Sequence, residues 1–393
     1  MGWFGRKGAA GPVRPFLPGW LAGADQSGFA RGYAAQVEEV FRTNPVGQRA
    51  VRLIAGLVGD LPIDVADGQE PLLALVRADG LLEMLAGALL LHGNAYLQLA
   101  ADSHDRPVRL FALRPERVSV ATGSDGWPSA YVYRVGGDAS RIAARDPLGR
   151  RQIAHLKQYD PVDDHYGSGC LDAAIGPASV HNRASRWNKA LLDNAARPSG
   201  ALMYEPADGS SLSSEQFDRL QTELAEQFSG AAQAGRPLLL DGGLKWQALS
   251  LTPADMDFVS LKEGAARDVA LAFGVPPVLV GLPGDATYAN AREAGRALFR
   301  HTVLPLAGRI LAGIEALLAD WAGPVGLAVD VDRISELAED RARLWAQVEA
   351  ATFLSDDEKR AMLGFLPRDV AAAATAAENQ VANDAVVLDG VAP

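Results

Sequence analysis

The chain has 393 residues, of which 48% are hydrophobic and 22% charged, and its formal net charge is −11 at pH 7. This length allows two or three domains with cores of their own, and the composition is ordinary for a soluble globular protein. The net negative charge argues against a protein that binds nucleic acid through its overall charge. It does not exclude a channel that nucleic acid passes through, because an acidic wall repels phosphate and so discourages binding.

The first third of the chain predicts an α+β domain behind an irregular N-terminus. Residues 1–30 are rich in glycine and proline and show no period, so we expect a flexible arm. Helices are predicted over 44–59 and 71–91, the second interrupted at Gly80, and strands over 61–65, 95–100, 107–113, 117–121, 131–135 and 153–157. We expect the strands over 117–121 and 131–135 to continue the sheet of the preceding pair, which gives mostly antiparallel strands.

Helix and strand alternate in the middle of the chain. A helix is predicted from Leu171 to Ala196, with Pro177 as a point where it can restart. A strand over 201–204, a helix over 213–229 with a Ser213–Gln216 capping box and a hairpin over 237–249 follow. The next helix runs from Thr252 to Phe273, and the sequence Gly274-Val275-Pro276-Pro277 ends it.

The C-terminal third is mainly helical. A loop over 282–287 precedes a long helix over 288–321, which we expect Pro305 to kink. A strand over 325–331 and helices over 334–353 and 355–363 come next. The tail over 371–393 has no basic residue and is dominated by alanine, so it is predicted to be disordered.

One loop holds the strongest enzyme-like cluster. Asp160, Asp163, Asp164 and His165 lie on a glycine-bounded loop and could hold a divalent metal. We favour a solvated acidic loop, because no other part of the chain supplies a matching ligand motif. A metal-dependent hydrolase that uses this loop remains the alternative function.

Nucleophilic and nucleotide chemistry have weaker support. Cys170 could pair with His165 or His155, but no known cysteine or serine signature surrounds it. We therefore interpret Cys170 as a small residue at a helix start and His155 as a packed sheet residue. A single cysteine also excludes an intramolecular disulfide framework. No Walker A or G-x-G-x-x-G sequence is present, so no cofactor is expected.

Several motifs, in this order and spacing, resemble the HK97-like family of bacteriophage portal proteins. They are Gly93-Asn94-Ala95-Tyr96, Ala196-Arg197-Pro198-Ser199-Gly200, the GRPLLLDGGLKW stretch from Gly235, an L-x-P-x-D step, A-x-x-F-G-V-P-P-x-L-V-G ending at Gly281, and Thr287-Tyr288-Ala289-Asn290 before an arginine-punctuated helix. The resemblance spans roughly Asn44 to Trp321. Each motif alone is weak, whereas their order is specific.

The resemblance implies a portal fold with named parts. Residues 31–176 and 274–331 would form the wing, 177–196 and 253–273 the two stem helices, 197–252 the clip and 332–370 a short crown. The tunnel loop would span 282–291, in front of the long helix over 288–321. Its DNA-facing residues would be Asp285, Thr287, Tyr288 and Asn290.

The same resemblance implies a non-enzymatic ring. Its subunits, typically twelve, would surround a channel for double-stranded DNA at a capsid vertex of a virion or phage-like particle, after assembly in the bacterial cytoplasm. The implied partners are further copies of the chain, the terminase large subunit, head–tail adaptor proteins and the major capsid protein. The alanine-rich, arginine-using composition suggests a prophage or gene transfer agent as source. We expect no membrane association, since the longest apolar run, Leu81–Leu91, contains Glu83 and is too short to span a bilayer.

Basic residues on the implied stem and long helix are candidates for DNA contact. Those on the stem are Arg183, Arg186, Lys189, Lys262 and Arg267, which could face the channel or the neighbouring subunit. Arg292, Arg296 and Arg300 are four residues apart and so share one helix face. For these three we favour salt bridges, for instance with Glu293, and pairing between subunits over DNA contact.

Overall fold

The computed structural model describes residues 32–65, 69–193, 200–204, 213–216, 218–219, 222, 244–248, 258–284 and 287–363. The chain divides into two compact units, and the boundary lies between Val329 and Asp330. The predicted arm over 1–30, the strand over 237–240 and the tail over 371–393 lie outside the described residues.

The described part of the first unit begins with helices. α1 (Tyr33–Val37) runs into a π-helical turn, η2 (Glu38–Arg42), and neither was predicted. α2 (Pro45–Gly59) confirms the predicted helix. Asn44 caps it, because Oδ1 of Asn44 accepts hydrogen bonds from the backbone N–H groups of Val46 and Gly47, both at 3.0 Å.

The helix predicted over 71–91 is interrupted where expected. α3 (Glu70–Arg77) and α4 (Leu81–His92) are joined by a 3-10 turn, η3 (Ala78–Gly80). Gly80 has a φ of 65°, a left-handed conformation that glycine adopts without strain. α4 packs against α2 with an apolar face of Leu81, Leu82, Leu85, Ala86, Leu89 and Leu90.

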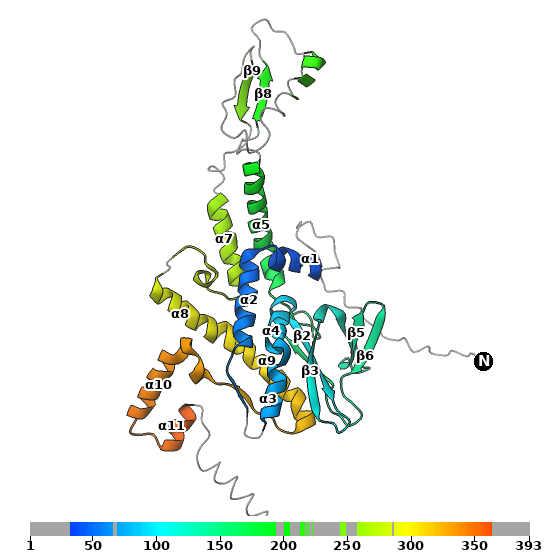
Figure 1. The fold of residues 1–393 in the computed structure, drawn as a ribbon, viewed down its shortest axis with the longest axis vertical. Helices are drawn as coiled ribbons and strands as arrows, with labels where there is room; N and C mark the ends of the chain where they lie inside the picture. The colour runs from blue at the N-terminus through cyan, green and yellow to red at the C-terminus, as the bar shows by residue number, and fades with distance from the viewer. Residues whose placement is uncertain are drawn as a thin grey trace, which may run out of the picture. The chain divides into compact units, whose positions relative to one another are not determined.

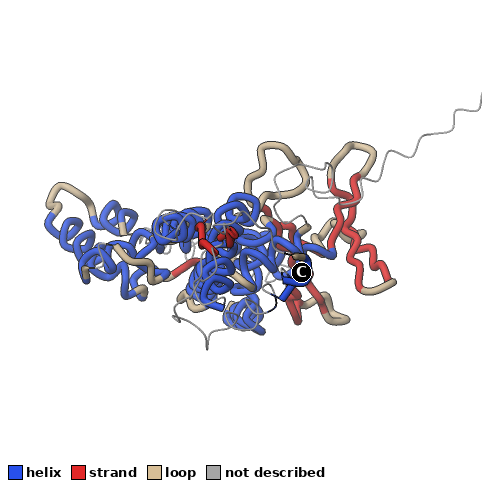
Figure 2. The backbone as a smooth tube through the Cα atoms, turned by 90° about the horizontal axis from the view of Figure 1, so that it is seen from above, coloured by secondary structure: helices blue, strands red, loops and turns tan. Residues whose placement is uncertain are grey.

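The strands form two separate three-stranded sheets rather than one. In the first sheet, β2 (Asn94–Ala101) lies between β3 (Pro107–Leu113) and β7 (Ile153–Lys157). The second sheet has the strand order β4 (Val118–Thr122), β5 (Pro128–Val135) and β6 (Asp138–Ala143). The expectation that 117–121 and 131–135 continue the first sheet was therefore wrong. Both edges of β2 are occupied by β3 and β7, and the turn η4 (Pro115–Arg117) ends β3 and precedes a new sheet. Strand β6 was not predicted. Figure 2 shows these strands gathered at one side of the helices.

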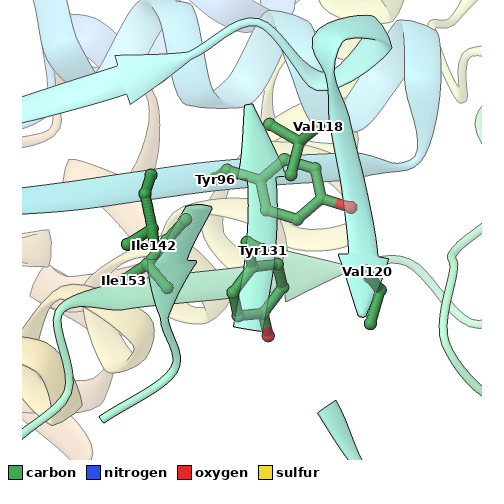
Figure 3. Packing of buried hydrophobic residues seen from close by; sticks show 6 residues of the cluster. All are labelled: Tyr96, Val118, Val120, Tyr131, Ile142 and Ile153. Atoms are coloured by element: carbon green, nitrogen blue, oxygen red, sulfur yellow. The ribbon is translucent and has the colours of Figure 1, made fainter. Parts of the chain in front are cut away.

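A buried cluster of the described residues joins the two sheets. Figure 3 shows Tyr96 of β2 and Ile153 of β7 together with side chains of the second sheet, namely Val118, Val120, Tyr131 and Ile142. The Tyr96 and Tyr131 rings meet edge to face, with centroids 5.7 Å apart, and His155 stacks on Tyr96 at 4.3 Å. Aromatic pairs of this kind add to the stabilisation from buried area.

The long C-terminal helix of the first unit contains a π-helical turn. α8 (Tyr288–Leu298) passes into η7 (Phe299–Val303) and then α9 (Leu304–Ala322). Pro305 is the second residue of α9, close behind the π turn, and it lacks the backbone N–H that a regular helix would use there. The kink expected at Pro305 stays a prediction. Residues 288–322 are long and apolar enough to cross a membrane by length and composition. However, α9 packs against α4 and β7 with Leu306, Ala307, Ile310, Leu311, Ile314, Leu317 and Leu318 all buried, as in the core helix of a globular unit.

A short ribbon joins distant parts of the first unit. β1 (Ile63–Val65) pairs antiparallel with β10 (Leu327–Val329), and Ile63 lies opposite Val329. Between these strands in sequence lie α5 (Leu171–Asp193), β8 (Gly200–Tyr204), β9 (Leu244–Ala248) and α7 (Phe258–Ala272). β8 pairs antiparallel with β9. The Ser213–Gln216 capping box is confirmed, since the N–H of Ser213 donates to Oε1 of Gln216 at 3.0 Å and the N–H of Gln216 donates to Oγ of Ser213 at 3.3 Å.

The second unit is small and helical. Two 3-10 turns, η8 (Val331–Arg333) and η9 (Ser335–Leu337), precede α10 (Ala338–Ala350) and α11 (Asp356–Met362). Ser355 and Glu358 form the capping box of α11, with 2.8 Å between the N–H of Ser355 and Oε2 of Glu358. The helix predicted over 334–353 is shorter than expected, because its first residues form η9 instead.

Candidate channel and subunit-contact surfaces

The two helices expected to form a stem lie side by side. α5 and α7 pack along each other and run in opposite directions (Figure 1). Small side chains let them approach closely, with Ala174, Ala178 and Ala184 buried on α5 and Ala265, Ala266 and Ala270 buried on α7. Pro177 lies inside α5, which continues through it, so the helix is not restarted there.

A buried polar network ties α5 to the N-terminal helices. Nδ2 of Asn44 donates to Oδ1 of Asn182 at 2.9 Å and lies 3.3 Å from Nδ1 of His181. Nδ2 of Asn182 in turn donates to the backbone oxygen of Glu39 at 2.8 Å, within the π turn η2. Asn44 is 1% exposed and Asn182 8% exposed. Burial lowers the pKa of His181, and the positive charge of Lys262 lowers it further, so the ring stays neutral.

Three of the five basic residues expected on the stem are exposed on α5. Arg183, Arg186 and Lys189 project from this helix. Arg186 lies 3.5 Å from Oε1 of Glu39, whose side chain is partly buried. Exposed pairs of this kind contribute little stability.

Of the two basic residues on α7, one holds the following loop. Lys262 is half-buried beside α5, while Arg267 is exposed and its guanidinium donates to the backbone oxygen of Pro283. Gly274 ends α7 with a φ of 68°, and its backbone oxygen accepts a hydrogen bond of 2.9 Å from Oγ1 of Thr302. A 3-10 turn, η6 (Pro277–Val280), then ends at Gly281, with a φ of 79°.

The predicted tunnel loop over 282–291 is partly helical. Asp285 lies outside the described residues. Thr287 is the N-cap of α8, since Oγ1 of Thr287 accepts a hydrogen bond from the N–H of Asn290 at 3.2 Å. Asn290 is therefore in the first turn of α8, and Tyr288, the first helical residue, is 79% exposed.

The arginines of the long helix have local partners. Arg292 lies over the Tyr288 ring at 5.8 Å, and Arg296 forms an ion pair of 3.5 Å with Glu293. The predicted salt bridge with Glu293 is thus confirmed within one chain. Arg300 lies in the π turn η7 and is exposed.

The acidic loop uses its carboxylates to hold its own backbone. Oδ1 of Asp160 accepts from the N–H of Val162 at 2.8 Å, and Oδ1 of Asp163 accepts from the N–H groups of His165 and Tyr166 at 2.7 and 3.0 Å. The backbone oxygen of Asp164 accepts from Lys157 at 2.5 Å. Over the described residues, no group of three or more histidine, cysteine, aspartate or glutamate side chains could hold a metal ion.

The histidine and cysteine considered for nucleophilic chemistry are packed residues. Nε2 of His155 lies 2.9 Å from Oδ1 of Asn94, and burial lowers the His155 pKa to about 3. Burial also raises the pKa of the Cys170 thiol to about 11, which suppresses the thiolate. The interpretation of His155 as a packed sheet residue is confirmed.

Two features of this region were not predicted. One is the Asn44–Asn182 network, whose polar residues carry no local pattern. The other is a groove of about 420 Å³, lined by Arg267, Asp268, Leu271, Gly274, Val275, Pro276, Pro277, Ala297 and His301. The groove is assembled from the end of α7, the turn after it and the α8–η7 helix. No sequence signal indicated this groove.

Comparison with known proteins identifies the fold. The family model described as phage portal protein matches residues 45–364. A protein of Rickettsia bellii is 39% identical over 84% of this chain and 88% of its own length, and the portal protein of Enterobacteria phage HK97 is 24% identical over 59% of this chain and 56% of its own.

Solved structures agree with that match. A chain in the neck of a native gene transfer agent particle, computed with C12 symmetry, is 44% identical over 87% of this chain and 97% of its own, with a TM-score of 0.66. An HK97-family portal protein from Corynebacterium diphtheriae shares the fold at 19% identity and a TM-score of 0.54, covering 77% of this chain and 96% of its own. With the paired α5 and α7 helices and the long α8–α9 helix in the order that the resemblance implied, the chain belongs to the phage portal protein family, in its HK97-like branch.

Proposed function

We propose that the chain forms a dodecameric ring around a channel for double-stranded DNA, at one capsid vertex of a gene transfer agent or related phage-like particle. The observation that carries this proposal is the similarity, at 44% identity over 87% of this chain, to a chain in the C12-symmetric neck of a gene transfer agent particle. Twelve-fold symmetry in that relative supports a closed ring of identical subunits here.

The partners follow from the same position. The clip, residues 197–252, would dock the terminase large subunit during packaging and head–tail adaptor proteins afterwards. The wing, residues 31–176 and 274–331, would meet the major capsid protein. Assembly would take place in the bacterial cytoplasm, and the crown over 332–370 would complete the ring.

The channel works passively in this proposal. The net charge of −11 discourages phosphate from sticking to the walls. Against that background, the exposed cations Arg183, Arg186 and Lys189 of α5, with Lys262 and Arg267 of α7, would steady DNA or the next subunit. Asp285, Thr287, Tyr288 and Asn290 would line the narrowest point. For Arg292, Arg296 and Arg300 we favour contacts between subunits.

The described residues give little support to an enzymatic role. Portal proteins are structural, and the carboxylates of Asp160 and Asp163 in the acidic loop accept hydrogen bonds from backbone N–H groups. The carboxyl group of Asp163, for example, accepts two such hydrogen bonds, which is the role of a turn-forming residue.

Two measurements test the proposal. Negative-stain microscopy and mass determination of the purified protein are expected to show closed rings of about twelve subunits with a central hole. Deleting the gene from a particle-producing strain is expected to abolish DNase-protected DNA, and the intact gene supplied in trans should restore it. A compact dimer in the first experiment, or undiminished protected DNA in the second, would contradict the proposal.

A further inference from the structure

The strand β7 forms one edge of the first sheet, and the outer side of this strand is unpaired. In an antiparallel pair, successive residues point their backbone N–H and C=O groups alternately toward and away from the neighbouring strand. The N–H of Gln158 donates to the backbone oxygen of Gly93 and so fixes the alternation. Ile153, His155 and Lys157 consequently point their backbone groups away from β2. None of the described residues forms a hydrogen bond with these outward groups.

A groove of about 370 Å³ follows this open edge. All five residues of β7 line it, together with parts of α9 and of the second sheet. On one face of β7, Leu156 packs against α9, where a Cβ added at Gly313 would lie 2.6 Å from it. On the other face, the His155 ring lies 5.8 Å from the ring of Tyr131 in the second sheet. A strand added to β7 would therefore be covered on both of its faces.

These features define the chemistry of an occupant. An extended peptide that pairs with a sheet edge gains affinity from main-chain hydrogen bonds, and the flanking walls select its side chains. It must supply N–H groups, so its paired residues cannot be proline. A strand buried on both faces is a continuous apolar run rather than an alternating one.

The charges of the groove lie toward its two ends. Arg145 and Arg151 come before β7, and Lys157 is its last residue. Asp320 lies 3.5 and 3.8 Å from the two arginines, whereas Lys157 donates to the backbone oxygen of Asp164. Three cations against the two carboxylates leave this region with a net positive charge, although the whole chain carries −11.

Two long stretches at the ends of the chain lie outside the described residues, namely 1–31 and 364–393. The first has more basic than acidic residues and contains three prolines, so both its charge and its backbone are unsuitable. The second has no basic residue after Arg368, and residues 384–389 have the sequence DAVVLD. This segment is a proline-free apolar run between two aspartates, as the walls and the charged ends of the groove require.

The spacing of the charges also agrees. Asp384 and Asp389 are five residues apart, which is about 17 Å in a strand. Arg151 and Lys157 are six residues apart, which is about 20 Å. Since each end of the segment carries an aspartate and each end of the groove a cation, the charges match whichever way the segment runs.

We propose that residues 384–389 of the chain's own C-terminus pair with β7 in this groove and add a fourth strand to the first sheet. The 20 residues over 364–383 connect the segment to the last described residue, Leu363, and can extend over about 70 Å. An open sheet edge is a template for pairing with other chains, so the added strand protects the subunit from edge-to-edge association. The inference does not depend on the proposed ring, because both partners belong to one chain.

Cysteine cross-linking of the full chain tests this pairing. In a Cys170→Ser background, Ala316→Cys on the α9 side of the groove is combined with Val387→Cys and treated with a short bis-maleimide. We expect a cross-link within one chain, identified by mass spectrometry of the joined peptides. The matched control combines Ala316→Cys with Thr375→Cys, which lies twelve residues earlier in the same tail.

The outcomes separate specific pairing from random encounters. A yield from the Val387 pair at least tenfold above that from the Thr375 pair supports the proposal. Equal yields overturn it, and so does a ladder of covalent oligomers, which would show that the segment binds another copy. Ring formation by the unmodified protein tests the proposed function separately, since neither result decides the other.

Hydrogen exchange gives a second readout that needs no substitution in the groove. In the full chain, Val386→Asp with Leu388→Asp places charges in the apolar run, and we expect the outward amides of β7 to exchange at least tenfold faster. The matched control, Phe16→Asp with Leu17→Asp in the N-terminal stretch, should leave them unchanged. Unchanged exchange in the first variant, or faster exchange in the control, would refute the pairing.

Discussion

Removing the Asn44 side chain should loosen the junction between α2 and α5. In Asn44→Ala the first turn of α2 loses the acceptor for the N–H groups of Val46 and Gly47, at a cost of about 1 kcal/mol for an N-cap. Oδ1 of Asn182 loses its donor at 2.9 Å, and a buried group left without a partner costs about 1–3 kcal/mol. Together the change should reduce local stability by about 2–4 kcal/mol.

Hydrogen exchange measured by mass spectrometry suits this prediction. A two-state unfolding curve is not expected for a chain with two compact units, whereas exchange reports local opening. For peptides from α2 and α5, a loss of about 2–4 kcal/mol accelerates exchange about 30- to 700-fold, at 1.4 kcal/mol per factor of ten. Peptides from α10 in the second unit serve as the internal reference.

A matched variant separates the network from capping alone. Thr287→Ala removes an N-cap that is exposed and accepts one hydrogen bond, at 3.2 Å, so we expect about 0.5–1 kcal/mol and only a few-fold faster exchange in α8. If Asn44→Ala accelerates exchange in α2 no more than Thr287→Ala does in α8, and leaves α5 unchanged, the argument that the buried network holds α5 is refuted.

Four further predictions follow from the described geometry. Gly93 has a φ of 77°, and an added Cβ would overlap the backbone of Ser168, so Gly93→Ala should sharply reduce the yield of soluble protein. Gly264→Ala, in an open part of α7, should instead stabilise that helix by about 0.5–1 kcal/mol, measured as a few-fold slower hydrogen exchange in α7 peptides. Similar behaviour of the two variants would refute the close approach at Gly93. His155 is neutral in the folded state down to a pKa of about 3, whereas in the unfolded chain it takes up a proton near pH 6.5. The stability that the neutral ring contributes is therefore fully present above pH 6.5 and is lost as the pH falls toward 3. His155→Phe should reduce the slope of folding stability against pH in that window by about one proton, and an unchanged slope would contradict this. Arg267→Ala frees the backbone oxygen of Pro283 and should speed limited proteolysis at residues 281–284, with no change expected from Arg292→Ala. Arg183→Glu combined with Lys189→Glu should leave rings intact but lower the DNase-protected DNA per particle, and undiminished DNA would show that these cations do not act on it.

Local patterns predicted most of the individual elements. Asn44 and Pro45 marked the start of α2, Gly80 marked the break between α3 and α4, and Ser355 with Glu358 marked the start of α11. Capping and left-handed turns depend on residues within one turn of each other, so they can be read from sequence.

Features that depend on distant partners were not predictable in this way. The pairing of β1 with β10 joins residues near 64 to residues near 328, and the polar strand β6, whose residues are mostly exposed, lacked a hydrophobic signal. The split into two sheets depended on β7 taking the free edge of β2. The π turns η2 and η7 likewise arise where helices meet other elements.

The candidate surfaces show the same difference between local features, which sequence predicts, and features built from distant residues, which it does not. The Arg296–Glu293 pair is three residues apart on one helix and was predicted from spacing alone. The groove around Leu271 combines α7, the turn after it and the α8–η7 helix, so no single stretch of sequence displays it. The family motifs located Gly274 to Pro277 without indicating that these residues line a concave surface.

The side-by-side packing of α5 and α7 bears on how this family diversifies. Because the two helices run antiparallel in close contact (Figure 1), the end of α5 at Asp193 and the start of α7 at Phe258 belong to neighbouring helices. A segment with this entry and exit behaves as a cassette: its length and composition can change while the helices that carry it keep their spacing. Under the proposed function, recombination that exchanges residues 194–257 would change the segment that docks the packaging motor and keep the rest of the portal subunit unaltered.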